Sequence, residues 1–201
     1  MKLYYAPGAC SLAPHIAARE AGVPLELAQV SFPKKNVEGE GSFYDINPKG
    51  AVPALRLDDG SVLTENAVLL QYIAEQAPQS DLLPPAGSSE RWRLLELVNF
   101  IATEVHKGFG PLWNPAVTPE VREATVQTLG KRFDFLQTQL GDKPYLTGER
   151  FTIADAYAFA ILSWTRVHKI DLGPWAGLQA YLQRVAARPA VQEALKAEGL
   201  A

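Results

Sequence analysis

The stretch YYAPGACSLAP, residues 4–14, decides the fold of the first part of the chain, and it contains the only cysteine, Cys10. Lys2–Tyr5 favours a short strand, and the residues from Leu12 onward favour a helix. Cys10 therefore lies where a strand gives way to a helix. The unpaired N–H groups and the positive dipole end of such a helix favour a thiolate, so the position suits a reactive sulfur. The alternative is a small buried hydrophobic residue, which is the usual role of a lone cysteine.

Turn and cap residues mark the ends of the elements that follow. Ser11 is expected to cap the first helix, with Pro14 in its first turn, and Gly22 with Pro24 to end it. A second strand is expected over 25–30. Residues 31–50 are polar and weakly periodic, which predicts a long loop that carries the cations Lys34 and Lys35.

A hairpin and a helix complete this small α/β unit. The Asp59-Gly60 step favours a tight turn between strands at 54–57 and 61–63. A helix is then expected from about Glu65 to Gln76, with Thr64 as its N-cap.

Residues 79–88 are rich in Pro, Gly and Ser and separate a strand-bearing region from one without a convincing strand. We therefore expect an α+β domain over 1–78, a linker over 79–88 and an all-helical domain over 89–201. Its helices are expected over about 92–112, from Pro119-Glu120, from the capping-box pattern Thr152–Asp155 to about His168, and after Pro174 and Arg188-Pro189.

Composition narrows the classes of partner. The chain has 201 residues, of which 47% are hydrophobic, and a net charge of -3, so no charge excess favours nucleic acid or an anionic membrane. One cysteine excludes an internal disulfide. No secretory signal segment and no run of about 18 apolar residues is seen, so a cytoplasmic protein is expected, without a metal.

The segment Asn47–Leu55 places Pro53 at the start of a strand, where a proline removes a ladder hydrogen bond. A cis Val52-Pro53 bond would leave the backbone of Val52 free to pair with an extended peptide ligand. The alternative is a trans proline that ends a loop.

Four motifs occur in order along the chain: residues 5–11 (YAPGACS), residues 47–53 (NPKGAVP), residues 63–65 (LTE) and His106-Lys107. Together with the small-domain, helical-domain order, they resemble the bacterial beta-class glutathione transferases nearly end to end. The resemblance implies a thioredoxin-like N-terminal domain followed by an all-α C-terminal domain. It also implies that Pro53 is cis and that Cys10 forms or contacts the glutathione sulfur.

The resemblance also implies the contacts to glutathione. Glu65 would bind the γ-glutamyl ammonium, and Asn66 with the N–H groups that open its helix would bind the adjacent carboxylate. Val52, before Pro53, would pair with the cysteinyl unit, and Lys35 would reach the glycyl carboxylate. For Glu65 the alternative is a carboxylate that only stabilises the first turn of a helix.

A second group of residues would act on the sulfur and the electrophile. His106 and Lys107 match a pair in the beta class, and Tyr5 and Ser11 are rival donors to the sulfur. An apolar pocket would be lined by Phe109, Leu112, Trp113, Trp164 and His168. Plain interhelical core is the alternative for this set. Asp155 is assigned to folding rather than chemistry.

These features predict a homodimeric detoxification enzyme that conjugates glutathione, its co-substrate, to apolar electrophiles, with thiol–disulfide exchange or peroxidase activity through Cys10 left open. A non-catalytic binding protein of the same fold, either a ligand carrier or a regulatory module, is the alternative. Isomerase or dehalogenase chemistry is a third hypothesis, because it differs only in the electrophile.

Overall fold

The computed structural model describes residues 1–32 and 34–201. The strand β1 (Lys2–Tyr5) lies inside a six-stranded sheet whose strands are ordered β4-β3-β2-β1-β5-β6. It pairs parallel with β2, Tyr4 opposite Ala28, and antiparallel with β5, Tyr4 opposite Ala54. The remaining strands and short helices of this part are β2 (Glu26–Ser31), β3 (Asn36–Val37), β4 (Gly41–Ser42), η1 (Phe43–Asp45), β5 (Ala54–Arg56), β6 (Val62–Thr64) and η2 (Pro78–Ser80).

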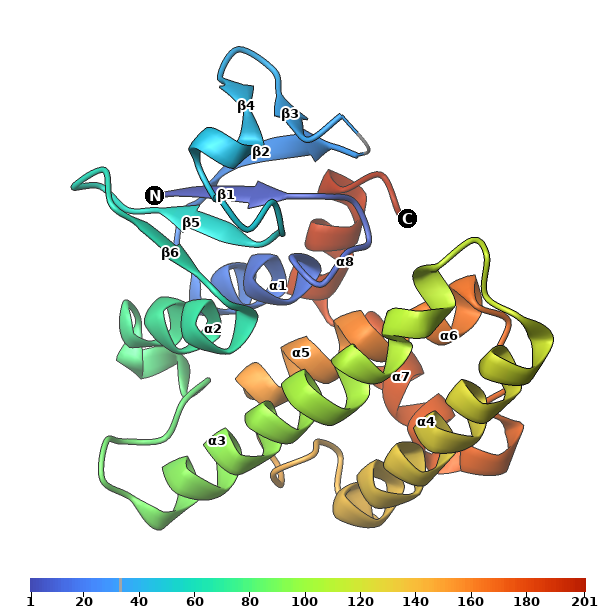
Figure 1. Ribbon diagram of the computed structural model, residues 1–201. Helices are drawn as coiled ribbons and strands as arrows, with labels where there is room; N and C mark the ends of the chain where they lie inside the picture. The colour runs from blue at the N-terminus through green and yellow to red at the C-terminus, as the bar shows by residue number, and fades with distance from the viewer. Residues whose placement is uncertain (33) are drawn as a thin grey trace. The chain divides into compact units, whose positions relative to one another are not determined.

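The helices α1 (Leu12–Ala21) and α2 (Asn66–Glu75) pack against each other on one side of the sheet, and α8 (Pro189–Ala197) packs against α1 (Figure 1). The predicted strand-to-helix change around Cys10 is confirmed, as is the end of α1 at Gly22, whose φ of 66° is left-handed. Gly60, with a φ of 86°, makes the predicted turn between β5 and β6.

Of the two predicted helix caps, Ser11 does occupy the N-cap position of α1 but without a side-chain capping bond, and Thr64 is wrong. The Oγ of Ser11 makes no capping bond, because it is hydrogen-bonded to both backbone groups of Ala6. Thr64 ends β6 instead of opening α2, and Glu65 occupies the cap position with a φ of 73°.

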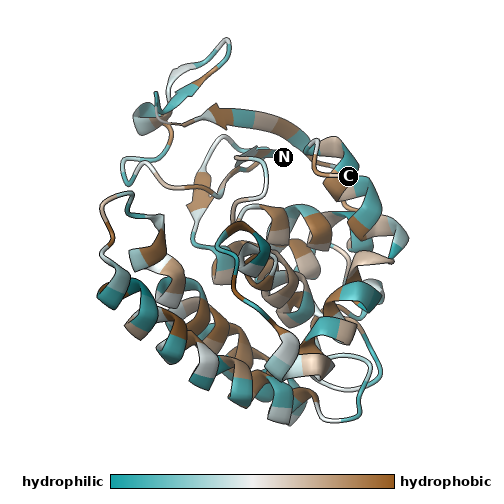
Figure 2. Ribbon diagram, turned by 90° about the vertical axis from the view of Figure 1, so that its right-hand side faces the viewer, coloured by the Kyte–Doolittle hydropathy of each residue, from teal (hydrophilic) through white to brown (hydrophobic). Residues whose placement is uncertain are grey.

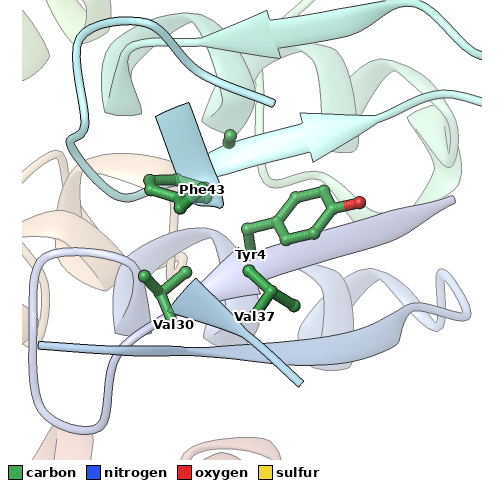
Figure 3. Close-up of a cluster of buried hydrophobic side chains, with 5 residues drawn as sticks. Tyr4, Val30, Val37 and Phe43 are labelled. Atoms are coloured by element: carbon green, nitrogen blue, oxygen red, sulfur yellow. The ribbon is translucent and has the colours of Figure 1, made fainter. Parts of the chain in front are cut away.

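The long loop predicted over 31–50 is also wrong, because this segment contains β3, β4 and η1. Its apolar side chains Val37 and Phe43 join Tyr4, Val30 and Ala54 in a buried cluster. Figure 3 shows Val30, Val37, Tyr4 and Phe43 lying together, and the rings of Tyr4 and Phe43 are 5.9 Å apart. Since side chains alternate along a strand, this cluster covers the side of β1 opposite to the one that Leu3 occupies.

By contacts the chain divides into two compact units, Met1–Leu83 with Ala187–Ala201, and Pro84–Ala186. The last helix therefore lies with the first unit, because α8 packs on α1; the sequence pattern had placed it with the helical region over 89–201. The expected linker over 79–88 stays a prediction of where the domains separate.

The second unit is helical. Its elements are α3 (Ser89–Phe100), η3 (Ile101–His106), η4 (Lys107–Trp113), α4 (Pro119–Leu140), α5 (Ile153–Leu162), α6 (Trp164–Val167), η5 (Gly173–Trp175) and α7 (Ala176–Ala186). The helix expected over 92–112 changes from α to π geometry at Ile101 and to 3-10 geometry at Lys107. Trp92, near the start of α3, is 66% exposed.

Hydrophobic and hydrophilic residues alternate along the helices (Figure 2). Within the described part of the chain, no helix is both long enough and apolar enough to cross a membrane.

Candidate functional site

Cys10 lies in the loop between β1 and α1, and 8% of its surface is exposed. Its Sγ donates a hydrogen bond to the carbonyl oxygen of Val52 at 3.3 Å. The predicted cis bond between Val52 and Pro53 is present. The thiol of Cys10 therefore contacts Val52, the residue whose backbone was expected to pair with a peptide ligand.

Asn66 approaches Cys10 from the start of α2. Its Nδ2 donates to the carbonyl oxygen of Cys10 at 2.8 Å, and its Oδ1 is buried without a hydrogen-bond partner among the described residues. An unpartnered buried acceptor is costly, so a donor that enters this place would be favoured. The expected contact of Asn66 with a ligand carboxylate stays a prediction, and in this structure the amide holds the cysteine backbone.

The two rival donors occupy buried positions. Ser11 is fully buried, and its Oγ accepts from the N–H of Ala6 and donates to the carbonyl of Ala6, both at 3.2 Å. Tyr5 is 7% exposed, and burial raises the pKa of its phenol, with a smaller contribution from the charge of Glu198. Ser11 therefore shapes the loop before Cys10. Catalytic roles for Ser11 and Tyr5 stay predictions.

Glu65 presents an exposed carboxylate at the start of α2. Its Oε1 accepts from the Nζ of Lys49 at 2.5 Å, and the same Nζ donates to the Oγ1 of Thr64 at 2.8 Å. Lys49 lies within the motif 47–53, but no feature of that motif predicts its pairing with Glu65. The side chains of Lys49 and Glu65 are 55% and 67% exposed, which allows a cationic ligand to replace the lysine.

The backbone before Pro53 is shaped by two polar side chains. Asn47, buried, donates through Nδ2 to the carbonyl of Ala51 at 2.7 Å. Lys35 donates to the carbonyl of Gly50 at 2.6 Å, its Nζ lies 3.4 Å from the ring centre of Phe32, and burial lowers its pKa. Lys35 is thus placed beside the predicted peptide-binding segment, and the motif 47–53 did not predict the structural role of Asn47.

His106 ends the π-helical segment η3 of the second unit. Its Nδ1 lies 2.8 Å from the hydroxyl of Tyr157, and its ring meets Trp164 edge-on at 5.1 Å. π-helical segments often occur at functional sites. Tyr157 was missed, because an apolar helix run gives no sign that its hydroxyl faces a histidine. Lys107 is exposed.

The predicted pocket residues do gather in one cluster. Trp113 packs on His168 at 4.3 Å and on Trp164 at 5.1 Å, while Phe109 packs on Trp164 at 5.6 Å. Phe109 is fully buried, and Leu112 and Trp164 nearly so, whereas Trp113 is 49% exposed. Phe109, Leu112 and Trp164 therefore belong to the core of the second unit, which was the alternative to a pocket lining. Trp113 is the member of this cluster with a large exposed surface.

His168 completes the cluster. Its Nε2 is buried without a hydrogen-bond partner among the described residues, and its pKa is lowered by burial and then by the charge of Arg122. The neutral imidazole is therefore favoured at this position. Cys10 belongs to the first unit and His106 to the second, so their pairing stays a prediction.

Comparison with known proteins places these features in a family. The model of the glutathione S-transferase N-terminal domain matches residues 8–76, and the model of the C-terminal domain matches residues 100–189. Glutathione S-transferase GstA of Escherichia coli O157:H7 is 47% identical over 201 residues, which cover the whole of both chains. The chain belongs to the glutathione S-transferase family.

Two solved structures of glutathione S-transferases support the same assignment over their full length. A sphingomonad enzyme complexed with glutathione is 44% identical with a TM-score of 0.95, and a beta-class enzyme of Sphingomonas chungbukensis is 43% identical with a TM-score of 0.95; each covers 100% of both chains. The predicted resemblance to the bacterial beta class is confirmed, and so is the fold class of a thioredoxin-like domain followed by a helical domain.

This glutathione S-transferase also contains a buried polar centre in its second unit. The carboxylate of Asp155 accepts from the N–H groups of Leu146 and Thr152, both at 2.9 Å, and from the hydroxyl of Tyr181 at 3.0 Å. The predicted capping box is confirmed, and the folding role assigned to Asp155 stays a prediction. Burial raises the pKa of Asp155, and these hydrogen bonds lower it by a smaller amount.

Proposed function

We propose that this glutathione transferase binds glutathione beside Cys10 and transfers its sulfur to an apolar electrophile. The observation that carries the proposal is the contact of the Cys10 thiol with the carbonyl of Val52 at 3.3 Å. A ligand that pairs with the backbone of Val52, as an added strand does, would bring its own sulfur close to Cys10. The sphingomonad relative was solved in complex with glutathione, which agrees with this choice of ligand.

The charged ends of glutathione have partners in the first unit. The exposed carboxylate of Glu65 would bind the γ-glutamyl ammonium in exchange for Lys49. The N–H groups at the start of α2 and the side chain of Asn66 would bind the neighbouring carboxylate. Lys35 would turn from the carbonyl of Gly50 to the glycyl carboxylate.

The reaction follows from the chemistry of a thiolate. The glutathione thiol releases its proton to water, and the thiolate attacks an electrophilic carbon, where a C–S bond forms and the leaving group departs with its electron pair. His106 and Lys107 would stabilise the thiolate, and Trp113 would offer its half-exposed ring to the electrophile. Cys10 also supports thiol–disulfide exchange, because a sulfur can form a mixed disulfide and a hydroxyl cannot.

A homodimer in the cytoplasm completes the proposal. Exposed aromatic side chains such as Trp92, 66% exposed, offer apolar surface to a second copy. Gel filtration at micromolar concentration is expected to give twice the mass of the chain, and a monomer would exclude the dimer.

The test is a calorimetric titration of reduced glutathione into the purified protein, followed by turnover assays with an activated aryl chloride. We expect saturable binding and conjugation, the latter lost when glutathione is omitted. Binding of glutathione and of an apolar dye without turnover of any electrophile or disulfide would replace the enzyme with a ligand carrier. No heat at millimolar glutathione, with the fold intact, would exclude the proposed site.

A further inference from the structure

Lys35 is a partly buried cation whose two close partners carry no charge. Its Nζ donates to the carbonyl oxygen of Gly50 at 2.6 Å and lies 3.4 Å from the ring centre of Phe32. In the described part of the chain, Lys35 forms no ion pair with a carboxylate. A carboxylate that arrives from outside would therefore be the first anionic partner of this ammonium.

The other lysines of this region are held differently. The Nζ of Lys49 is paired with the carboxylate of Glu65 at 2.5 Å, and Lys34 is exposed. A carboxylate partner competes with an incoming carboxylate, because both bind the same ammonium. The ring of Phe32 attracts a cation without supplying an oxygen, so it leaves the N–H donors of Lys35 for a ligand.

The backbone of Lys35 is fixed in an uncommon conformation. Its φ of 50° is left-handed, which residues with a side chain rarely adopt, and such backbone is concentrated at functional sites. Its carbonyl accepts from the N–H of Phe43 at 2.8 Å, and Phe43 is fully buried. The sheet therefore fixes where this side chain starts, and the ring of Phe32 acts on where its charged end lies.

The pair of Lys35 and Gly50 lies close to the segment expected to bind the ligand. Gly50 comes two residues before Val52, whose backbone would pair with the cysteinyl unit. Because the glycyl unit follows the cysteinyl unit in glutathione, it is expected near the residues that adjoin Val52. The ring of Tyr44 lies directly against Gly50, since a methyl group built on that Cα would be 2.5 Å from the Cε1 of Tyr44.

We propose that Phe32 is a positioning residue that holds the ammonium of Lys35 where the glycyl carboxylate of glutathione arrives. The inference rests on the proposed function, since it concerns the same ligand. A cation over a ring face has no single preferred direction, so the ammonium can turn from Gly50 toward the carboxylate while it stays on the ring. Recognition of this end of glutathione thereby depends on a side chain that has no polar atom.

The experiment compares two ligands that differ only at this end, reduced glutathione and its glycyl ethyl ester, in which the carboxylate has lost its charge. Calorimetric titration gives both Kd values for the parent and for each variant. The ratio of the ester Kd to the glutathione Kd reports the contribution of the carboxylate. A general loss of binding or stability changes both Kd values and cancels in the ratio. Thermal unfolding shows whether each variant is folded.

Phe32→Leu keeps an apolar side chain and removes the ring. We expect it to raise the Kd for glutathione about fivefold and to leave the Kd for the ester within about twofold, so that the ratio falls. Phe32→Tyr restores a ring and should return the ratio to within about twofold of the parent. In turnover assays, Phe32→Leu should raise the KM for glutathione and leave kcat unchanged, because the contact acts on binding.

Two further variants separate the ring contact from other effects. Tyr44→Leu is the matched control, because it removes a ring that is 52% exposed, against 46% for Phe32, and that contacts Gly50. It should change both Kd values by the same factor. Lys35→Met should lower the ratio at least as much as Phe32→Leu does, and adding Phe32→Leu to it should have no further effect on the ratio.

The same ratio in the parent and in Phe32→Leu would overturn the inference, while binding of glutathione by that parent would keep the proposed function. A further fall of the ratio on adding Phe32→Leu to Lys35→Met would also overturn it, since the ring would then act without the ammonium. If Phe32→Leu does not fold, Phe32→Met takes its place with the same expected result. No binding of glutathione by the parent would reject the proposed function and the inference together.

Discussion

Cys10 in the first unit is held by backbone groups and buried polar side chains, whereas His106 in the second unit is held mainly by aromatic rings. The cysteine contacts the carbonyl of Val52 and the amide of Asn66. The histidine packs against Trp164, and its Nδ1 lies within hydrogen-bond distance of the hydroxyl of Tyr157. Hydrogen bonds fix distances and directions, while ring packing tolerates changes of shape. This difference agrees with the proposal that the first unit binds glutathione and that the second unit offers its rings to apolar electrophiles.

The largest expected effect concerns the buried carboxylate of Asp155 in the second unit, because hydrogen bonds and not aromatic rings surround this group. Asp155→Ala leaves the N–H groups of Leu146 and Thr152 and the hydroxyl of Tyr181 without their acceptor. We expect the free energy of unfolding to fall by about 3 kcal/mol. Urea denaturation measures it, with the exposed Asp142→Ala as the control. A loss below about 1 kcal/mol would contradict the role assigned to Asp155.

Glutathione affinity tests the polar half. Glu65→Ala removes the carboxylate proposed for the γ-glutamyl ammonium, and is expected to raise the Kd about thirtyfold, close to 2 kcal/mol. Calorimetric titration measures the change. Glu38→Ala, an exposed carboxylate in the turn between β3 and β4, is the control and should keep the parental Kd. An unchanged Kd in the Glu65 variant would mean that its carboxylate only opens α2.

Electrophile affinity tests the aromatic half. Trp113→Ala removes the half-exposed ring that packs on His168, and should raise the KM for an apolar electrophile about fivefold while the Kd for glutathione stays constant. Steady-state kinetics with varied electrophile measure this split. Phe135→Ala, which removes a ring of the same unit that is 46% exposed, is the matched control. Equal effects of the two variants would place the electrophile elsewhere.

The smallest expected effect concerns Glu40, which ties the β3–β4 turn to β1 and β5. Lys2, Tyr4 and Arg56 lower the pKa of Glu40 from 4.5 to about 2. Because the folded-state pKa is depressed, the stabilisation is complete above about pH 4.5 and is lost as the pH falls toward 2. Unfolding free energies of the parent should therefore drop across this window by about 1 kcal/mol more than those of Glu40→Gln.

The control for this pH effect is Glu38→Gln, whose exposed carboxylate lies in the same turn. It should keep the parental dependence on pH. A Glu40→Gln variant with the same slope as the parent would show that the network around Tyr4 does not depend on the carboxylate charge.

Much of the site could be predicted because its signals are local. Gly22 and Gly60 needed left-handed backbone where the sequence placed turns, and both have it. The motif around Pro53 predicted the cis bond through resemblance. Local signals failed where a side chain had two possible partners. Ser11 is hydrogen-bonded to Ala6 rather than to the N–H groups of its helix. Residues 31–50 form short strands and a short helix because Val37 and Phe43 are buried in the core, although their weak periodicity predicted a loop.

The sequence by itself determined where the cysteine lies, which residues turn the chain around it, and which motifs place the chain in the glutathione S-transferase family. These features depend on residues that are adjacent in the sequence. Only the tertiary structure decided that the Sγ of Cys10 meets Val52, that Lys49 pairs with Glu65, and that Glu198 reaches Gly8 from the far end of the chain. Such contacts join residues distant in sequence, and burial selects them only when the sheet and its helices close around a shared core.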